Sequence, residues 1–190
     1  MSTVSIIGQG NMGSAIAGIV AAGGNDVQHV GRDAAQEIPG DIVVLAVPVH
    51  AEAEIVATHG AKLAGKVVVE ISNPINFETF DSLTVPADSS AAQQLAEALP
   101  EARVLKAFNT NFAATLASKK VGDAPTTVLV AGDDDAAKQA LAAVLSAGGV
   151  DSVDVGALKR ARELEAIGFV QLALAVGEKI PFTGGFALQR

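Results

Sequence analysis

Three glycines near the start of the chain, Gly8, Gly10 and Gly13, constrain its fold more than any other feature. They follow a short apolar run at residues 4–7 and precede apolar residues at helical spacing over residues 12–22. Between a strand and a helix, this spacing permits a tight turn, lets a pyrophosphate approach the backbone and allows the helix to pack closely on the strand. The motif therefore predicts a dinucleotide-binding turn, the alternative being a glycine-rich turn without a ligand.

The phosphate-binding part of this predicted site is the turn together with the start of the helix. A helix N-terminus offers free backbone N–H groups and a partial positive charge, and both favour phosphate. The candidate residues are Gly8, Gln9, Gly10, Asn11, Met12 and Gly13.

The residues after the second apolar run bear on which dinucleotide is bound. NAD-binding units usually carry an acidic residue at this strand end, which accepts a hydrogen bond from the ribose 2′-hydroxyl. This chain has Gly31 and Arg32 there, followed by Asp33. Because a guanidinium suits a 2′-phosphate, the pattern favours NADP. Alternatively, Arg32 is a solvated turn residue that pairs with Asp33, or Asp33 itself serves NAD.

Short apolar runs alternate with helical stretches along the chain, which is typical of parallel βα units. The sequence predicts strands at about residues 4–7, 26–30, 41–47, 67–71, 103–108, 126–131 and 150–155, and helices at about 12–22, 51–59, 90–99, 113–117, 133–147 and 158–176. We expect an α/β fold with a Rossmann-type, doubly wound, mostly parallel sheet and a small C-terminal helical annex. Residues 1–155 would form the NADP-binding domain, and residues 156–190 would complete the cleft and a homodimer interface.

The carboxyl ends of the other predicted strands should line the same cleft. The small apolar residues that follow the third predicted strand could cover one face of a cofactor ring. The asparagines that follow the next two strands could hydrogen-bond a carboxamide or a ribose hydroxyl. Each asparagine could instead be a turn residue that bonds its own backbone. The candidates are Ala46, Val47 and Pro48 in the first group, then Asn73, Pro74 and Asn109.

No obvious acid–base residue stands at these predicted strand ends. The chain has no cysteine and no tyrosine, which excludes disulfides and both thiolate and phenol chemistry. His50 could touch a ligand or be an exposed residue at a helix start, and Lys106 falls inside a predicted strand, where we expect a structural role. We therefore assign no catalytic side chain and expect hydride transfer to another redox ring, which needs positioning more than a strong acid.

The charge balance argues against several classes of partner. The net charge is −8, from 21 acidic and 13 basic side chains, which disfavours nucleic acid and anionic lipid. The three histidines lack the spacing of a helical zinc motif, so we expect no metal site. The N-terminus has no basic region, and the most apolar late segment, residues 166–177, is too short to span a bilayer. We expect a cytoplasmic protein without a membrane partner.

The end of the chain offers a cover for the cleft. A last predicted helix opens with charges at residues 159–165 and continues with residues 166–170, which are apolar on more than one face. Such a helix is buried, here either under the tail or in a dimer interface. Phe182 and Phe186 then flank a glycine pair. This tail could cap the cleft or be an ordinary ordered terminus.

The order of these motifs resembles the F420-dependent NADP oxidoreductase family over nearly the whole chain. The strings KAFNT and KRARELE, in this order after the glycine motif, are much more specific than the glycine motif alone. The matching segments are residues 8–13, 31–32, 46–48, 72–74, 106–110, 158–165 and 183–186.

The resemblance implies NADP(H) in the glycine-rich site, a homodimer, and hydride exchange with a deazaflavin, coenzyme F420, in the cleft. It implies that residues 8–13 hold the pyrophosphate and that residues 31–32 hold the 2′-phosphate. The nicotinamide side would be lined by Val47, Pro48 and Asn73, with Asn109 nearby. Two alternatives stay open: a ferric or flavin reductase, because membrane ferric reductases carry a similar domain, and a non-catalytic NADP(H) sensor.

One departure from the usual unit is large. Only residues 33–40 separate Arg32 from the third predicted strand, whereas a crossover between parallel strands normally needs a dozen or more residues. We therefore expect the second crossover helix to be missing or one turn long. That change would open the adenine pocket and leave Arg32 with few neighbours to help it bind a phosphate.

Overall fold

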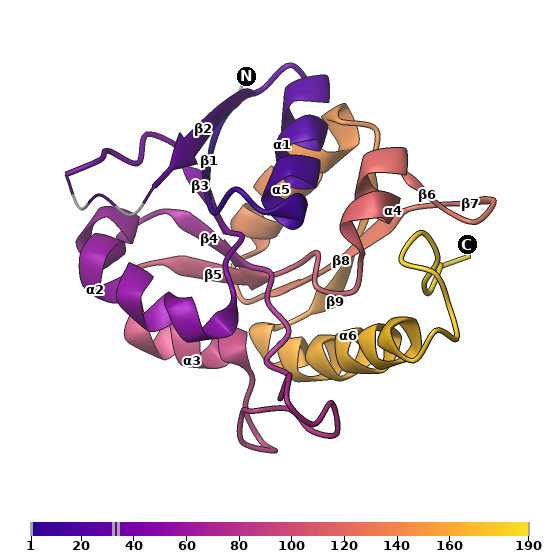
Figure 1. The fold of residues 1–190 in the computed structure, drawn as a ribbon. Helices are drawn as coiled ribbons and strands as arrows, with labels where there is room; N and C mark the ends of the chain where they lie inside the picture. The colour runs from indigo at the N-terminus through magenta and orange to yellow at the C-terminus, as the bar shows by residue number, and fades with distance from the viewer. Residues whose placement is uncertain (1, 32, 34, 190) are drawn as a thin grey trace.

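The computed structural model describes residues 2–31, 33 and 35–189, which form a seven-stranded sheet with helices on both faces (Figure 1). The strands of this sheet are β1 (Thr3–Ile7), β2 (Asp26–Val30), β3 (Ile42–Leu45), β4 (Val67–Glu70), β5 (Arg103–Lys106), β8 (Thr127–Gly132) and β9 (Asp151–Gly156). A separate hairpin consists of β6 (Lys120–Val121) and β7 (Ala124–Pro125). The helices are α1 (Asn11–Ala22), α2 (Glu52–Leu63), α3 (Ala91–Ala98), α4 (Ala113–Ser118), α5 (Asp135–Ala147) and α6 (Ala161–Val176), with 3₁₀ turns η1 (Val49–Ala51) and η2 (Leu158–Arg160).

The strand order, β2-β1-β3-β4-β5-β8-β9, reverses its direction of growth at β1. Strand β1 pairs in parallel with β2 on one side and with β3 on the other, and β4 and β5 continue in parallel. The prediction of a Rossmann-type, mostly parallel sheet is therefore confirmed. In such sheets ligands bind outside the carboxyl ends of the strands where the order reverses, which here is between β1 and β3.

The last two strands of the sheet run against the first five. Strand β8 is antiparallel to β5, and β9 follows β8 in parallel. The connection from β5 to β8 contains only the six-residue helix α4 and the β6–β7 hairpin. A helix of this length rises about 9 Å, too little to carry the chain back along the sheet. The chain therefore stays near the carboxyl edge, where α4 contacts α1, and returns through β8.

Alternation along the central strands divides the hydrophobic core into two clusters. In β3, Val44 joins the cluster under α1, α4 and α5, whereas Val43 and Leu45 join the cluster under α2 and α3. Figure 1 shows these two groups of helices on opposite sides of the sheet. Because successive strand residues point to opposite faces, a strand covered on both sides reads as a continuous apolar run.

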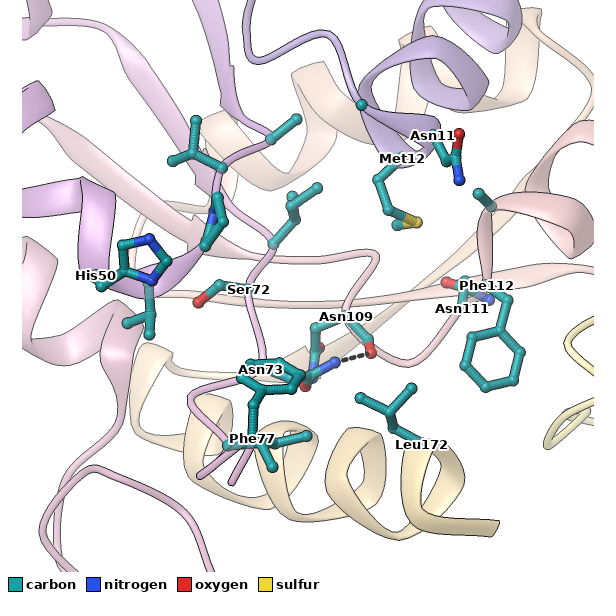
Figure 2. A pocket seen from close by; sticks show the side chains of 18 of the residues that line it. Asn11, Met12, His50, Ser72, Asn73, Phe77, Asn109, Asn111, Phe112 and Leu172 are labelled. Atoms are coloured by element: carbon teal, nitrogen blue, oxygen red, sulfur yellow. Dashed lines mark hydrogen bonds between the residues drawn. The ribbon is translucent and has the colours of Figure 1, made fainter. Parts of the chain in front are cut away.

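Strand β5 ends two residues earlier than the sequence predicts. After Lys106 the chain turns sharply, and Phe108 has a φ of 63° although it is not a glycine. The Phe108 side chain is buried in the core, which keeps this apolar residue in an unusual backbone conformation. The turn that follows directs Asn109 and Asn111 toward the carboxyl edge of the sheet (Figure 2).

The connection from β2 to β3 is as short as the residue count predicts. Among its described residues, 31, 33 and 35–41, none is helical. Ile38 fills the core there, and Gly40 N donates to Ser5 Oγ at 3.0 Å as the chain passes β1. Lys66 Nζ donates to Gly40 O at 2.9 Å. A Cβ on Gly40 would lie 2.5 Å from Ser5 N, so only glycine fits this crossing.

None of the helices in the described part of the chain is long and apolar enough to span a membrane.

Replacing Gly40 with alanine tests the tight crossing. We expect Gly40→Ala to lower the free energy of unfolding by about 1–3 kcal/mol, because the new methyl group must displace the β1 backbone. Gly18→Ala is the matched control, since a Cβ at Gly18 meets nothing within 4 Å and lies in a helix. Urea unfolding of both variants measures the effect. Equal stability of the two variants would show that the crossing is not tight.

Candidate functional site

The glycine-rich turn between β1 and α1 has the geometry that its spacing predicts. Gly8 has a φ of +111°, and a Cβ there would lie 2.2 Å from Ala46 O. A Cβ on Gly13 would lie 2.4 Å from Gly8 O. A Cβ on Gly10, by contrast, meets nothing within 4 Å, so open space lies over the turn. Gly8 and Gly13 therefore serve packing, whereas Gly10 faces a cavity.

The start of α1 provides donors to this open space. Gly10 is the N-cap of the helix and has no side chain to cap it, and the first turn contains no acidic residue. The N–H groups of a first helical turn have no partner within the helix. Asn11 and Met12 belong to that turn and line the cavity. The arrangement fits a pyrophosphate at the turn.

The cavity extends from the glycine turn across the carboxyl edge of the sheet, with a volume of about 1000 Å³. Figure 2 shows Met12 entering from α1, His50 and Phe112 on opposite sides, and Leu172 reaching up from α6. The wall near the turn includes Ala46, Val47 and Pro48. Among the described lining residues, His50 alone has a titratable side chain, so the cavity is largely apolar and suits flat rings.

Two asparagines form a paired unit in the cavity wall (Figure 2). Asn73 Nδ2 donates to Asn109 O at 2.8 Å, and Asn109 Nδ2 donates to Asn73 Oδ1 at 2.9 Å. Asn109 Nδ2 also donates to Leu164 O of α6 at 2.8 Å. A Cβ on Gly168 would lie 2.2 Å from Asn73 Oδ1, so glycine lets α6 approach the pair. The two amides are therefore oriented by α6.

Several polar atoms of the cavity wall lack a partner within the described part of the chain. Asn109 Oδ1, Asn111 Oδ1 and Ser72 Oγ are buried and make no hydrogen bond there. All three residues line the cavity. Because a buried polar group is costly when it is unpaired, such atoms indicate a ligand that would satisfy them. Together with the turn, they fit a dinucleotide whose nicotinamide end reaches the asparagines.

A cluster of buried charges lies directly beneath these strand ends. Lys106, the last residue of β5, donates to Glu70, the last residue of β4, and to Ser72 O at 2.6 Å. It also donates to Glu165 Oε1 of α6 at 2.9 Å. Glu165 Oε2 accepts from Ala91 N, at the start of α3, at 3.1 Å. The cluster therefore joins β4, β5, α3 and α6 at the floor of the cavity.

Burial and charge act against one another in this cluster. Burial alone would lower the pKa of Lys106, but the charges of Glu70 and Glu165 outweigh it and raise that pKa above its usual value. Burial also raises the pKa of Glu165, and the charge of Lys106 opposes this shift. A third carboxyl, Glu52 of α2, is packed beside Glu70, and burial and the Glu70 charge raise its pKa to about 9. Burial and the neighbouring charge therefore favour the protonated form of this carboxyl.

Three other predicted site residues, Gln9, Gly31 and Pro74, lie outside the cavity lining. Gln9 is exposed in the turn, and Gly31 is exposed, with its N–H donating to Gln36 Oε1 at 2.7 Å. Pro74 is buried, and its carbonyl accepts from Thr84 N at 2.6 Å, so it holds the following loop. Arg32 lies outside the described residues. Of the predicted residues, Gly10, Asn11, Met12, Ala46, Val47, Pro48, Asn73 and Asn109 line the cavity.

The sequence did not reveal the charge cluster, nor the place of Phe112 and Leu172 in the cavity wall. Phe182 belongs to the tail that could cap the cleft, and it lines the cavity too, with its ring 5.1 Å from that of Phe112. A signal for the cluster was present, because Glu70 and Lys106 each end an otherwise apolar run. A charge at the end of a strand buried on both faces indicates a buried partner.

Removing the central cation tests the cluster. We expect Lys106→Met to lower the free energy of unfolding by about 3–5 kcal/mol, because two carboxylates are left buried without a cation. The loss should shrink at acid pH, where carboxylates take up protons. Arg160→Met is the control, because Arg160 pairs with Glu163 at the surface and such pairs contribute about 1 kcal/mol or less. Urea unfolding at two pH values measures the free energy of unfolding of both variants. Similar losses of stability in the two would argue against a buried cluster held by Lys106.

Comparison with known proteins places this geometry among reductases, although no family model matches the chain. The chain is 31% identical over 159 residues to the F420-dependent NADP reductase of Methanocaldococcus jannaschii, a match that covers 80% of this chain and 69% of the relative. It is also 36% identical over 120 residues to the metalloreductase STEAP3 of Rattus norvegicus, covering 63% of this chain. That match spans only 23% of the longer relative.

Solved structures agree with this placement. A candidate F420-dependent NADP reductase from Arthrobacter sp. FB24 matches 100% of both chains, with a TM-score of 0.83 and 27% identity. The hypothetical protein SMa0349 from Sinorhizobium meliloti has a TM-score of 0.71 and 30% identity, and the match covers 83% of this chain and 86% of that one. The sequence match over more than two thirds of the Methanocaldococcus protein, with the glycine turn and the paired asparagines at one cavity, shows that this chain belongs to the F420-dependent NADP reductase family.

Proposed function

We propose that this protein transfers a hydride between NADP(H) and a deazaflavin, coenzyme F420. Membership of its family makes it an NADP-dependent oxidoreductase; the acceptor is the proposed part. The observation that carries the proposal is that one continuous cavity of about 1000 Å³ joins the glycine turn to an apolar chamber. A cavity of this size accommodates a nicotinamide and a second flat ring together.

Different residues of the chain would bind different parts of the cofactor. Gly10, Asn11 and Met12 would hold the pyrophosphate with backbone N–H groups at the start of α1. Val47 and Pro48 would cover one face of the nicotinamide, and the amides of Asn73 and Asn109 would orient its carboxamide or ribose. When bound, the reduced nicotinamide supplies a hydride that a deazaflavin ring accepts together with one proton.

The far side of the cavity would exclude water from the acceptor ring. Phe112, Leu172 and Phe182 bring apolar surface from three separate segments to the same wall. A dry site strengthens the polar interactions within it and protects a hydride donor from side reactions. The tail therefore would serve as part of the cleft cover.

The assembly and location are further parts of the proposal. We propose a cytoplasmic homodimer formed through the outer face of α6. The support is apolar surface: Val170 and Val176 are about half exposed on α6, at 50% and 48%, and Ile167 is 37% exposed. Large exposed apolar residues on one helix often mark an interface.

An acceptor screen tests the proposed reaction. Purified protein is mixed with NADPH and, separately, with F420, a free flavin and a ferric chelate, while NADPH absorbance is followed. We expect F420 to be reduced with the highest kcat/KM. Preference for ferric chelate or flavin would support the alternative that the similarity to the metalloreductase STEAP3 favours. NADPH binding without turnover of any acceptor would support a sensor.

Gly10→Val tests the binding turn. A Cβ at Gly10 occupies open space in the folded protein, so the variant should fold, but its side chain fills the room that the pyrophosphate needs. We expect the Kd for NADPH to rise at least about 100-fold in calorimetric titration. Gly18→Val, with equal room for a Cβ but away from the cavity, should bind normally. Normal binding by Gly10→Val would contradict the assignment of the turn.

Arg32→Ala tests the choice of NADP over NAD. If Arg32 binds the 2′-phosphate, its loss should weaken NADPH by about 1–3 kcal/mol and leave NADH nearly unchanged. Arg162→Ala, which removes an exposed guanidinium from α6, is the control and should change neither affinity. Equal losses for NADPH and NADH would remove the 2′-phosphate role from Arg32.

A further inference from the structure

A buried polar side chain lies in the apolar second half of α6, where the helix passes the cavity. Gln171 is only 2% exposed, and it stands one residue before Leu172, which lines the cavity. A buried amide is costly unless both its donor and its acceptor find partners. The partners of Gln171 therefore show what this side chain holds in place.

The two ends of the Gln171 amide bond two different segments. Gln171 Nε2 donates to Thr110 O at 3.1 Å, and Gln171 Oε1 accepts from Phe186 N at 2.8 Å. Thr110 is buried and stands between Asn109 and Asn111, which both line the cavity. The amide therefore joins the turn after β5 to the tail that follows α6.

The tail has to reverse its direction to reach Gln171, and Figure 1 shows it turning back from the end of α6. Just after the helix, Glu178 has a φ of 57°. A second turn closes where Gly184 N donates to Pro181 O at 2.9 Å. Gly185 then has a φ of +139°, and a Cβ there would lie 2.7 Å from Gln171 Oε1. The close approach of the tail to Gln171 therefore depends on a glycine.

The stretch of tail that this bond holds contains Phe182, which lines the cavity. Its ring lies 5.1 Å from the ring of Phe112, the N-cap of α4, at an angle of 58°. The Phe182 residue is 51% exposed. A half-exposed ring pair is a weak tether by itself, because fixing a chain terminus costs conformational entropy. The buried hydrogen bond at Gln171 supplies a second tether.

We propose that Gln171 is a positioning residue that pins the tail, so that Phe182 forms the acceptor-side wall of the cavity, and that this wall selects a flat ring acceptor over a small ferric chelate. The inference rests on the proposed hydride transfer. Phe182 contacts the acceptor, whereas Gln171 acts only through the tail. The tail is then a functional part of the site rather than an ordinary ordered terminus.

The selection follows from the surface that the wall offers. A flat ring that packs against Phe182 removes apolar surface from water on both partners, and aromatic faces stack favourably. A hydrated ferric chelate presents no such face. The proposed nicotinamide position is at Val47 and Pro48, on the side of the glycine turn. Loss of the wall should therefore weaken ring acceptors and leave NADPH binding and chelate reduction unchanged.

Phe186→Pro tests the pinning bond without altering the core, because the donor is a backbone N–H group and proline has none. We expect the KM for F420 to rise about tenfold, as for the loss of one apolar ring contact. The Kd for NADPH and kcat/KM for a ferric chelate should stay at their wild-type values. Phe186→Ala keeps the N–H group, so the difference between these two variants measures the backbone bond alone.

Leu188→Pro is the matched control. It places a proline in the same tail, at a backbone N–H group that has no hydrogen-bond partner among the described residues. We expect its KM for F420 to equal that of the wild type. An equal rise in Leu188→Pro and Phe186→Pro would assign the effect to a stiffened tail and overturn the role of the bond.

Gln171→Met and Phe182→Ala test the two ends of the arrangement. Methionine is close to glutamine in size but makes neither hydrogen bond, so Gln171→Met should raise the KM for F420 as much as Phe186→Pro does. Phe182→Ala should do the same, and adding Phe186→Pro to it should raise the KM no further, since both remove one wall. Phe182→Leu should recover part of the loss. Additive losses, or an equal rise in the Kd for NADPH, would overturn the positioning role.

A measurement without substrate follows the tail directly. The chain has no tryptophan and no tyrosine, so Phe182→Trp gives the protein a single indole emitter at the wall. We expect acrylamide to quench this emission more strongly when Phe186→Pro is added, and equally when Leu188→Pro is added. Equal quenching in all three proteins would overturn the pinning of the tail by Gln171.

The proposed reaction and the role of Gln171 fail separately. A wild type that reduces no ring acceptor would overturn the reaction and, with it, the selection by the wall. A wild type that reduces F420, with Phe186→Pro unchanged in its KM for F420, would overturn the role of Gln171 alone.

Discussion

Lys106 is the constraint on which the carboxyl edge of the sheet depends. A fully buried ammonium needs hydrogen-bond acceptors. Lys106 has Glu70 at the end of β4, the carbonyl of Ser72 just after it, and Glu165 on α6. Buried ion pairs add little net stability compared with apolar packing, because desolvation offsets their attraction. Their effect here is on geometry, since Lys106 reaches all of its hydrogen-bond acceptors only when β4, β5 and α6 are arranged in this way.

The same arrangement builds the cavity wall. With α6 held at Glu165, its neighbour Leu164 presents a carbonyl to Asn109, and Gly168 leaves room for Asn73. The amide pair is therefore set by a helix that lies far from the glycine turn in sequence. Positioning of this kind suits hydride transfer between rings, which depends on alignment more than on a strong acid or base in the wall.

The sequence predicts local features well and distant contacts poorly. The role of Gly8, Gly10 and Gly13 depends only on neighbouring residues, so spacing alone locates the turn. Counting residues likewise predicts the short crossover. The direction of β8 does not follow from its sequence, because the same apolar run would suit a parallel or an antiparallel strand. The hydrogen bond between Lys106 and Glu165 joins residues that are 59 positions apart in the sequence, and no periodic pattern connects them.

If the cavity brings a nicotinamide and an acceptor ring together, the hydride passes directly from one ring to the other. The most direct measurement uses NADPH that carries deuterium on one face of the nicotinamide C4, reacted with F420 in ordinary water. With direct transfer, we expect deuterium from one face to be recovered on the ring carbon of reduced F420 by NMR or mass spectrometry. Reduced F420 that carries no deuterium from either labelled face would contradict it.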